Sequence, residues 1–352
     1  MATLTEAAYY SRKAVNWGIA ALIGFVILRI SFNWAVAAIK QAFPPPPLVP
    51  NNLFGKLPQV VFPSTASPSG QLTFTLQTIS GTVPDASDAA KVFFMPKNRI
   101  NLLSLSKAQS FVSRLGFTGS PRQLTETAYR WIDLKSPLRS IEMDIVSNQF
   151  RLSYSFTHDL TLFAERNIPT QQQAINESLV FLQTLALSTA DITSTNTNIS
   201  YLKLIADKLE PTTSQSQADA VRIDFFRTGY VGLPVVYDKP NQSNISFVLS
   251  GSKRSDRRIL SVEYNYWPVE TRSTAIYKLK TSQQAWNQLT QGDAYFASYK
   301  TDQTKIVITN VYLAYYDSKQ EQLYMQPVFV FEGENNFVAY VPAIALPWVE
   351  QK

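Results

Sequence analysis

The sequence contains one histidine and no cysteine, so few of its side chains are suited to acid–base or nucleophilic chemistry. A catalytic triad or a proton shuttle would have to use the dipeptide His158-Asp159, because histidine is the side chain that titrates near neutral pH. No nucleophile elbow, glycine-rich phosphate loop or HExxH pattern accompanies it. We therefore expect His158 to lie in a surface turn. Thiolate catalysis and Cys-based metal sites are excluded outright.

A pair of carboxylates offers a second route to chemistry, since an exterior hydrolase can use two acids on one face. Glu142 and Asp144 alternate with apolar residues in SIEMDIVS, so they would share one face of a strand. The same alternation has a plainer interpretation, in which Ile141, Met143 and Ile145 pack inward and the acids face water. We prefer the solvated face.

Metal-binding patterns are weak. Asp85 and Asp88 in PDASDAA resemble a calcium loop only loosely, because the glycine and the terminal glutamate of such a loop are missing. A zinc site lacks both cysteine and a second histidine. The sequence thus predicts a protein that is not an enzyme and that has no metal or cofactor.

Four basic residues gather in SKRSDRR between two apparent strands, which predicts a cationic hairpin tip. If this tip binds anything, polyanionic wall polymer or anionic lipid headgroups fit its charge best. The alternative is an ordinary solvated turn. The four residues are Lys253, Arg254, Arg257 and Arg258.

Aromatic residues near expected strand ends form a second candidate interaction surface. Tyr264, Tyr266 and Trp267 end one strand, and Tyr315 and Tyr316 end another. Packing in a core between modules explains the same residues, and it is the interpretation we favour.

An apolar run near the N-terminus covers residues 14–39. It would determine where the rest of the chain lies relative to a membrane. From Trp17 to Trp34 a helix would span roughly 25 Å, close to the thickness of the bilayer core, with the two indoles at the interfaces. Arg29 lies near the outer end of this helix, where it can snorkel to the headgroups or contact a partner helix. We predict a single transmembrane anchor in the lipid bilayer.

The flanks of the anchor predict its orientation. Arg12 and Lys13 precede it and the uncharged AFPPPPLVP follows it, so the N-terminus should be cytoplasmic and the C-terminal domains extracytoplasmic. The expected location is therefore the cell membrane. A cleaved signal peptide ending at residues 35–37 is the alternative. Arg29, Asn33 and Trp34 disfavour it, because they lengthen the segment past a usual h-region and interrupt the approach to that cleavage site.

Composition limits the partners. The net charge is +6, yet charged residues make up only 16% and both signs are scattered along the chain. Nucleic-acid binders concentrate Lys and Arg on one face, so a nucleic-acid partner is not expected. Acidic wall polymers and anionic headgroups are better counter-surfaces for an exterior domain.

Three Ser/Thr-x-x-Gln capping boxes, at Ser106, Thr170 and Thr281, predict three short helices. Each is followed by runs of alternating apolar residues that predict antiparallel strands. The chain should therefore be α+β, with an N-terminal transmembrane helix and tandem antiparallel-sheet modules that each carry a short packed helix.

The expected domain boundaries follow from this recurrence and from the proline-rich stretch after the anchor. They are a cytoplasmic tail (1–13), the anchor (14–39), a stiff Pro-rich linker (40–70), a first α+β module (71–165), and a larger second one (166–352). A division of the second module into 166–270 and 271–352 is the alternative.

Three stretches of the C-terminal unit carry a resemblance to a known family: 277–294 (YKLKTSQQAWNQLTQGDA), 311–318 (VYLAYYDS) and 323–343 (LYMQPVFVFEGENNFVAYVPA). Through them this unit resembles the YycH/YycI-like membrane-anchored regulatory proteins, with PepSY-type and YpeB-like modules. The resemblance implies a non-enzymatic protein that adjusts signalling at the envelope by binding a protein partner, in part through its transmembrane helix. The Pro-rich linker and the long middle segment depart from that family, so the partner stays open. A cell-wall or polyanion-binding scaffold is the alternative.

Overall fold

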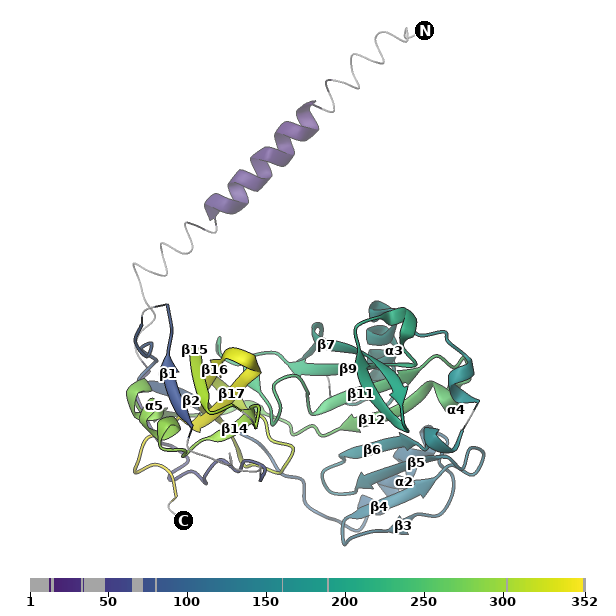
Figure 1. Cartoon of the computed structure of the whole chain (residues 1–352). Helices are drawn as coiled ribbons and strands as arrows, with labels where there is room; N and C mark the ends of the chain where they lie inside the picture. The colour runs from purple at the N-terminus through teal and green to yellow at the C-terminus, as the bar shows by residue number, and fades with distance from the viewer. Residues whose placement is uncertain are drawn as a thin grey trace. The chain divides into compact units, whose positions relative to one another are not determined.

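The structure is a computed structural model (Figure 1). It describes residues 13, 16–32, 34, 48–64, 72–79, 81–159, 161–188, 190–301 and 303–350. They belong to two compact units, Met1–Val49 and Pro50–Lys352, and each is treated by itself.

The first unit is helical over residues 16–32, and the side chains of Trp17, Arg29 and Trp34 are exposed. Within the described part of the chain, the structure has no helix of the length and apolar character that crossing a membrane requires. The remainder of the expected anchor, residues 14, 15, 33 and 35–39, and the tail 1–12 lie outside the described residues.

The second unit contains an antiparallel sheet of nine strands in the order β3-β4-β5-β6-β12-β11-β9-β7-β8 (Figure 1). Two helices, α2 (Ser104–Arg114) and α3 (Gln171–Thr184), bury Val112 and Leu182 in its core, and the short α4 (Ser255–Arg258) links β11 to β12. The strands are β3 (Arg122–Gln123), β4 (Ala128–Ile132), β5 (Arg139–Asp144), β6 (Phe150–Tyr154), β7 (Ile192–Ile205), β8 (Lys208–Thr212), β9 (Ala220–Arg227), β11 (Ile245–Ser250) and β12 (Ile259–Tyr264).

A second sheet of eight strands gathers segments from both ends of the unit. Two of its strands, β1 and β10, run parallel to β15, and its other pairings are antiparallel. The helix α5 (Ser282–Thr290) buries Ala285 and Leu289 against one of its faces. The strands are β1 (Thr73–Leu76), β2 (Ala89–Phe94), β10 (Val235–Val236), β13 (Glu270–Lys278), β14 (Tyr295–Ser298), β15 (Lys305–Tyr316), β16 (Tyr324–Gly333) and β17 (Phe337–Pro342).

Two of the three expected helix starts are confirmed. Thr170 and Thr281 each form a complete capping box with the glutamine three residues later. The start expected at Ser106 is wrong: α2 begins at Ser104, and the Ser106 hydroxyl donates to the carbonyl of Leu103, 2.9 Å away. Asn101 accepts from the Leu103 N–H at 2.9 Å, and this local turn starts the helix earlier.

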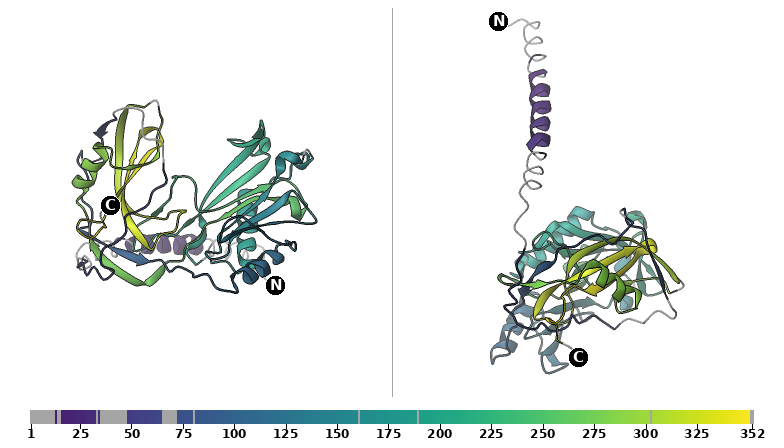
Figure 2. Two further views of the ribbon diagram at one scale, coloured as in Figure 1. Left: turned by 90° about the horizontal axis from the view of Figure 1, so that it is seen from below. Right: turned by 90° about the vertical axis from the view of Figure 1, so that its left-hand side faces the viewer.

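The α+β class with mostly antiparallel sheets is confirmed, but the strands do not follow the expected modules (Figure 2). β1 and β2, from the expected first module, pair with β15 and β13, near the C-terminal end. β6 pairs with β12, across the expected boundary at 165. Helices α2 and α3 share one sheet rather than each covering its own. The reason is that sheet pairing joins residues far apart in sequence, which local periodicity does not encode.

From Pro50 to residue 64, the segment expected to be a spacer is part of the second unit. Leu57 is fully buried, its N–H donates to the Trp348 carbonyl at 2.8 Å, and Asn51 donates to Ile276 at 3.0 Å. Apolar side chains at Phe54, Leu57, Val60 and Phe62 pack against the eight-stranded sheet. Residues 40–47 and 65–70 of the expected linker lie outside the described part.

Candidate functional site

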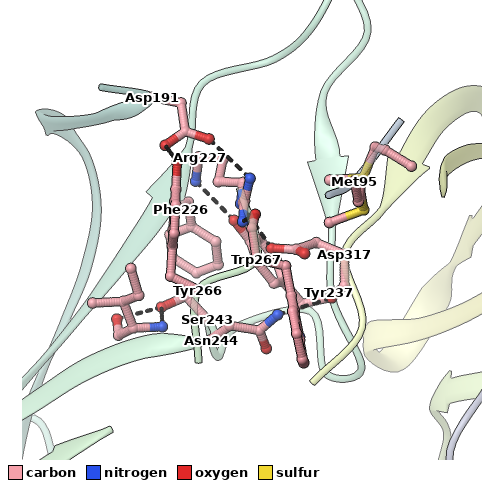
Figure 3. Close-up of polar contacts among 12 residues, drawn as sticks. Met95, Asp191, Phe226, Arg227, Tyr237, Ser243, Asn244, Tyr266, Trp267 and Asp317 are labelled. Atoms are coloured by element: carbon pink, nitrogen blue, oxygen red, sulfur yellow. Dashed lines mark hydrogen bonds and ion pairs between the residues drawn. The ribbon is translucent and has the colours of Figure 1, made fainter. Parts of the chain in front are cut away.

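A buried arginine lies where the strands of the two sheets meet (Figure 3). Arg227 ends β9, and only 3% of its side chain is exposed. Its Nη1 lies 3.0 Å from Asp191 Oδ2, directly before β7, and its Nε lies 2.9 Å from Asp317 Oδ2, directly after β15. Because Asp317 follows a strand of the eight-stranded sheet and Arg227 ends a strand of the other, the ion pair joins the two sheets. We call Arg227, Asp191 and Asp317 the junction.

Further contacts satisfy the guanidinium. Nη2 donates to the Trp267 carbonyl at 2.5 Å, and Nη1 lies 3.3 Å from the Tyr230 hydroxyl. The ring of Tyr266 lies under the guanidinium, 4.3 Å from its carbon, in a cation–π contact. The Tyr266 hydroxyl also donates to Asp191 at 3.0 Å, so the junction is a connected network.

The electrostatics of the junction are those of one cation shared by two acids. Burial alone would lower the pKa of Arg227, but the charges of Asp317 and Asp191 raise it above its ordinary value. Burial raises the pKa of Asp317 to about 6; Arg227 opposes this shift and Asp191 adds to it. Among the described residues, Asp317 Oδ1 has no hydrogen-bond partner, which adds to the cost of its charged form. The junction therefore keeps one cation and two carboxylates together in the interior, and it joins strands of the two sheets.

An open cleft of about 840 Å³ lies beside the edge strand β14. We call residues 58–63, which belong to no helix or strand, the strap; residues 59–63 form one wall of the cleft, and the C-terminal segment with Ile344 and Val349 forms another. Lys280 and Asp293 supply charged groups to the cleft.

The strap is held by side chains. Gln326 Nε2 donates to the Pro58 carbonyl at 2.9 Å, and Phe62 enters a box of tyrosines. The ring of Phe62 stacks on Tyr295 with centroids 4.8 Å apart and planes 2° apart, and it lies 4.8 Å from Tyr316. Both tyrosine hydroxyls donate to Asp238, at 2.9 Å and 2.5 Å. These two bonds hold the rings of Tyr295 and Tyr316 in position around Phe62.

Comparisons of this chain with known proteins do not identify a family. No family model matches the chain, and no curated protein matches it. Among solved structures, it is similar to the crystal structure of an uncharacterized protein from Eubacterium rectale ATCC 33656. That likeness has 13% sequence identity and a TM-score of 0.39, and it covers 73% of this chain and 82% of that chain. At this TM-score it supports no argument about fold or function.

The expected cationic tip is largely paired within the fold. Arg254 pairs with Asp256, Arg257 lies 3.3 Å from Asp159, and Arg258 makes two contacts with Glu177 in α3. The side chain of Lys253 is exposed. The acids that pair these arginines lie close in space but are scattered in sequence.

The expected aromatic surface is mostly interior. Trp267 is 9% exposed and its indole N–H donates to the Lys319 carbonyl at 3.4 Å, while Tyr266 is half-buried at the junction. Tyr264, Tyr315 and Tyr316 are also buried. The packing interpretation of these residues therefore agrees with their burial.

The residues that the sequence suggested for catalysis are not part of the junction. His158 is exposed in a turn of 3₁₀ helix, and the neighbouring Asp159 accepts from the Tyr154 hydroxyl at 2.6 Å. Glu142 pairs with Arg130.

The remaining acids belong to turns. Asp144 accepts from the Thr127 hydroxyl at 2.5 Å and caps the turn at Ser147, while Ile141 and Met143 are buried as the alternation predicts. Asp85 and Asp88 are exposed, and within the described part of the chain no group of His, Asp and Glu side chains could hold a metal ion.

Sequence reasoning missed Arg227, although a signal was present. In AVRIDFFR, residues 221, 223, 225 and 227 share one face of the strand, and the first three are Val, Ile and Phe. A charged residue in register with three core residues indicates a buried ion pair.

Proposed function

We propose that this chain is a non-enzymatic single-pass envelope protein whose second unit binds a polypeptide partner outside the membrane, as part of a membrane signalling complex. The apolar residues 14–39, the preceding Arg12 and Lys13, and the flanking indoles of Trp17 and Trp34 support the anchor and its orientation. The resemblance of the C-terminal unit to envelope regulators supports the signalling role.

The observation that carries the binding proposal is the strap beside the cleft. Residues 58–63 pack against the eight-stranded sheet without being part of a helix or strand, and the Gln326 side-chain amide and the ring of Phe62 hold them there. A protein that accommodates a stretch of its own chain in this way has the amides and apolar surface that an extended partner needs. The open volume next to the strap offers room for such a partner.

The test is site-specific photo-crosslinking in living membranes. A crosslinking amino acid at Val61, which is exposed and lines the cleft, should capture a distinct protein. The same amino acid at Lys208, exposed in β8 of the other sheet, serves as the matched control. Identical products from both positions, or none from Val61, would contradict the proposal.

The role of the anchor is tested separately. Affinity purification is done side by side on the full chain and on a chain that begins at Asn51. A membrane protein recovered only with the full chain, and lost with Arg29→Leu, supports contact through the helix. An unchanged complex in Arg29→Leu rules out that contact but leaves the cleft proposal standing.

The alternative, a scaffold that binds acidic wall polymer, has weaker support. Three of the four basic residues that would serve it already pair with acids of the fold. Neutralising Lys253, Arg254, Arg257 and Arg258 together should cut retention on wall fragments if that alternative is right.

A further inference from the structure

Lys280 is a half-buried cation at the edge of the cleft. It lies between β13 and the N-cap of α5, and its backbone N–H donates to the Ala343 carbonyl at 2.8 Å, which fixes its position. Its ammonium group donates to Gln288 Oε1 at 2.9 Å. The Gln288 amide is itself oriented, because its Nε2 donates to Asp293 Oδ2 at 3.1 Å.

The charge of Lys280 is only partly compensated. An ammonium group has three donors, and one bond from it to the described residues is recorded. No described carboxylate forms an ion pair with Lys280. Burial lowers its pKa, and the charge of Asp293 opposes that shift. A desolvated cation with spare donors in a cleft is a common feature of binding sites.

The other charges of the cleft limit what Lys280 can receive. Asp293 and Glu350 both line it, so the cleft carries one cation and two acids. Such a lining repels a polyanion but accepts a single carboxylate placed directly at the ammonium group.

The remaining walls are apolar. Phe62, Ile344, Leu346 and Val349 line the cleft, and the side chain of Leu346 is 64% exposed. Among the described residues, no backbone hydrogen bond of Val61 is recorded. The cleft therefore combines apolar surface with one cation and two acids.

We propose that the cleft binds an extended peptide with apolar residues and that Lys280 Nζ receives one carboxylate of that peptide, from an Asp or Glu side chain or from a free C-terminus. The inference rests on the proposed function, since it names the chemistry of the partner at the same site.

The test is selection of random peptides, displayed with a free C-terminus, on the full chain in lipid nanodiscs. The wild type is compared with Lys280→Met, and with Lys278→Met as the matched control. Lys278 is exposed at the end of β13 and does not line the cleft. Peptides selected on the wild type and on Lys278→Met should carry an acid at a fixed position, or bind in a register fixed by the C-terminus.

Synthetic copies of the selected peptides give the measurement. They should bind Lys280→Met about tenfold more weakly than the wild type, which corresponds to about 1.4 kcal/mol, and Lys280→Arg should recover most of the affinity. Replacing the acid by its amide, or amidating the C-terminus, should cause the same loss on the wild type and so identify which carboxylate is bound. Because the acidic peptide and its amide are compared on the wild type, this comparison also tests the role of the carboxylate if Lys280→Met fails to fold.

Two results would overturn the proposal in distinguishable ways. Selected peptides that bind Lys280→Met as well as the wild type, with no preference for an acid, would remove the role of Lys280 and keep peptide binding. Enrichment of no peptide on any variant, together with no crosslink at Val61, would overturn the proposed function as well.

Discussion

Arg227 Nε lies 2.9 Å from Asp317 Oδ2, and this ion pair connects the end of β9 with the residue that follows β15. The two side chains are 3% and 1% exposed, so both charges are removed from water. A buried ion pair gains little over an apolar pair of the same shape, but losing one partner leaves an uncompensated charge. We therefore expect the junction to specify how the two sheets join.

Replacing Arg227 by methionine tests this directly. The substitution keeps much of the side-chain volume but leaves the carboxylates of Asp191 and Asp317 buried without a cation. The free energy of unfolding should fall by about 3–5 kcal/mol in chemical denaturation. The control is Arg151→Met, whose side chain is 59% exposed and whose partner Glu263 keeps Lys319; it should cost no more than about 1 kcal/mol. Equal effects of the two variants would contradict a special role for the junction.

The raised pKa of Asp317 predicts a pH dependence that Asp317→Asn should remove. Burial raises this pKa from 3.8 to about 6, so the folded state holds the proton more tightly than the unfolded state does. This contribution favours folding below pH 3.8 and is lost as the pH rises through about 6. The free energy of unfolding of the wild type, minus that of Asp317→Asn, should therefore fall by about 2.4 kcal/mol between pH 4 and pH 7.

The difference between the two proteins is needed because other acids act in the opposite direction. Asp144, Asp159 and Glu263 have lowered pKa values, despite their burial, because of hydrogen bonds and nearby cations. Their contributions are lost as the pH falls, and they cancel in the subtraction. A difference that is flat with pH would show that Asp317 stays charged in the folded protein.

Much of the secondary structure was accessible from sequence, since it is local. The alternation in SIEMDIVS predicts β5, and the Thr170 and Thr281 capping boxes predict the starts of α3 and α5. The strand β7 (Ile192–Ile205) was not predicted, because most of its side chains are not buried and its Thr- and Asn-rich sequence shows no apolar alternation. The pairing of β1 with β15 was not predicted, because the local sequence of a strand does not indicate which distant strand it pairs with.

The candidate sites were harder to predict, because each depends on contacts between distant segments. Arg258 in SKRSDRR looks free in sequence, and only the fold brings Glu177 of α3 to it. The proline content of the strap suggests a spacer, whereas Phe62 contacts Tyr295 and Tyr316 more than two hundred residues later. The sequence shows which types of side chain are present, but the fold determines which residues they contact.

The strap should contribute to stability through Phe62. Phe62→Ala removes the stacked contact with Tyr295 and leaves a gap in the tyrosine box, so the free energy of unfolding should fall by about 2–3 kcal/mol. Val61→Ala is the control, because the side chain of Val61 is 54% exposed; it should change stability by no more than about 0.5 kcal/mol. Similar values for both would mean that the strap does not depend on its aromatic anchor.

The paired arginines of α4 predict that this segment has a structural role. Arg258 donates to both carboxylate oxygens of Glu177, at 2.8 Å and 2.7 Å, and to the Ser250 carbonyl at 2.7 Å, so it fastens α4 to α3 and to the end of β11. Arg258→Ala should lower the free energy of unfolding by about 2 kcal/mol, because charge-assisted bonds are lost and the Ser250 carbonyl loses a donor. Lys253→Ala removes a cation of the same segment whose side chain is exposed, so it should be nearly neutral. A thermal melt of both variants separates the two roles: equal melting temperatures would favour a free cationic tip, whereas a drop confined to Arg258→Ala assigns this arginine to the fold.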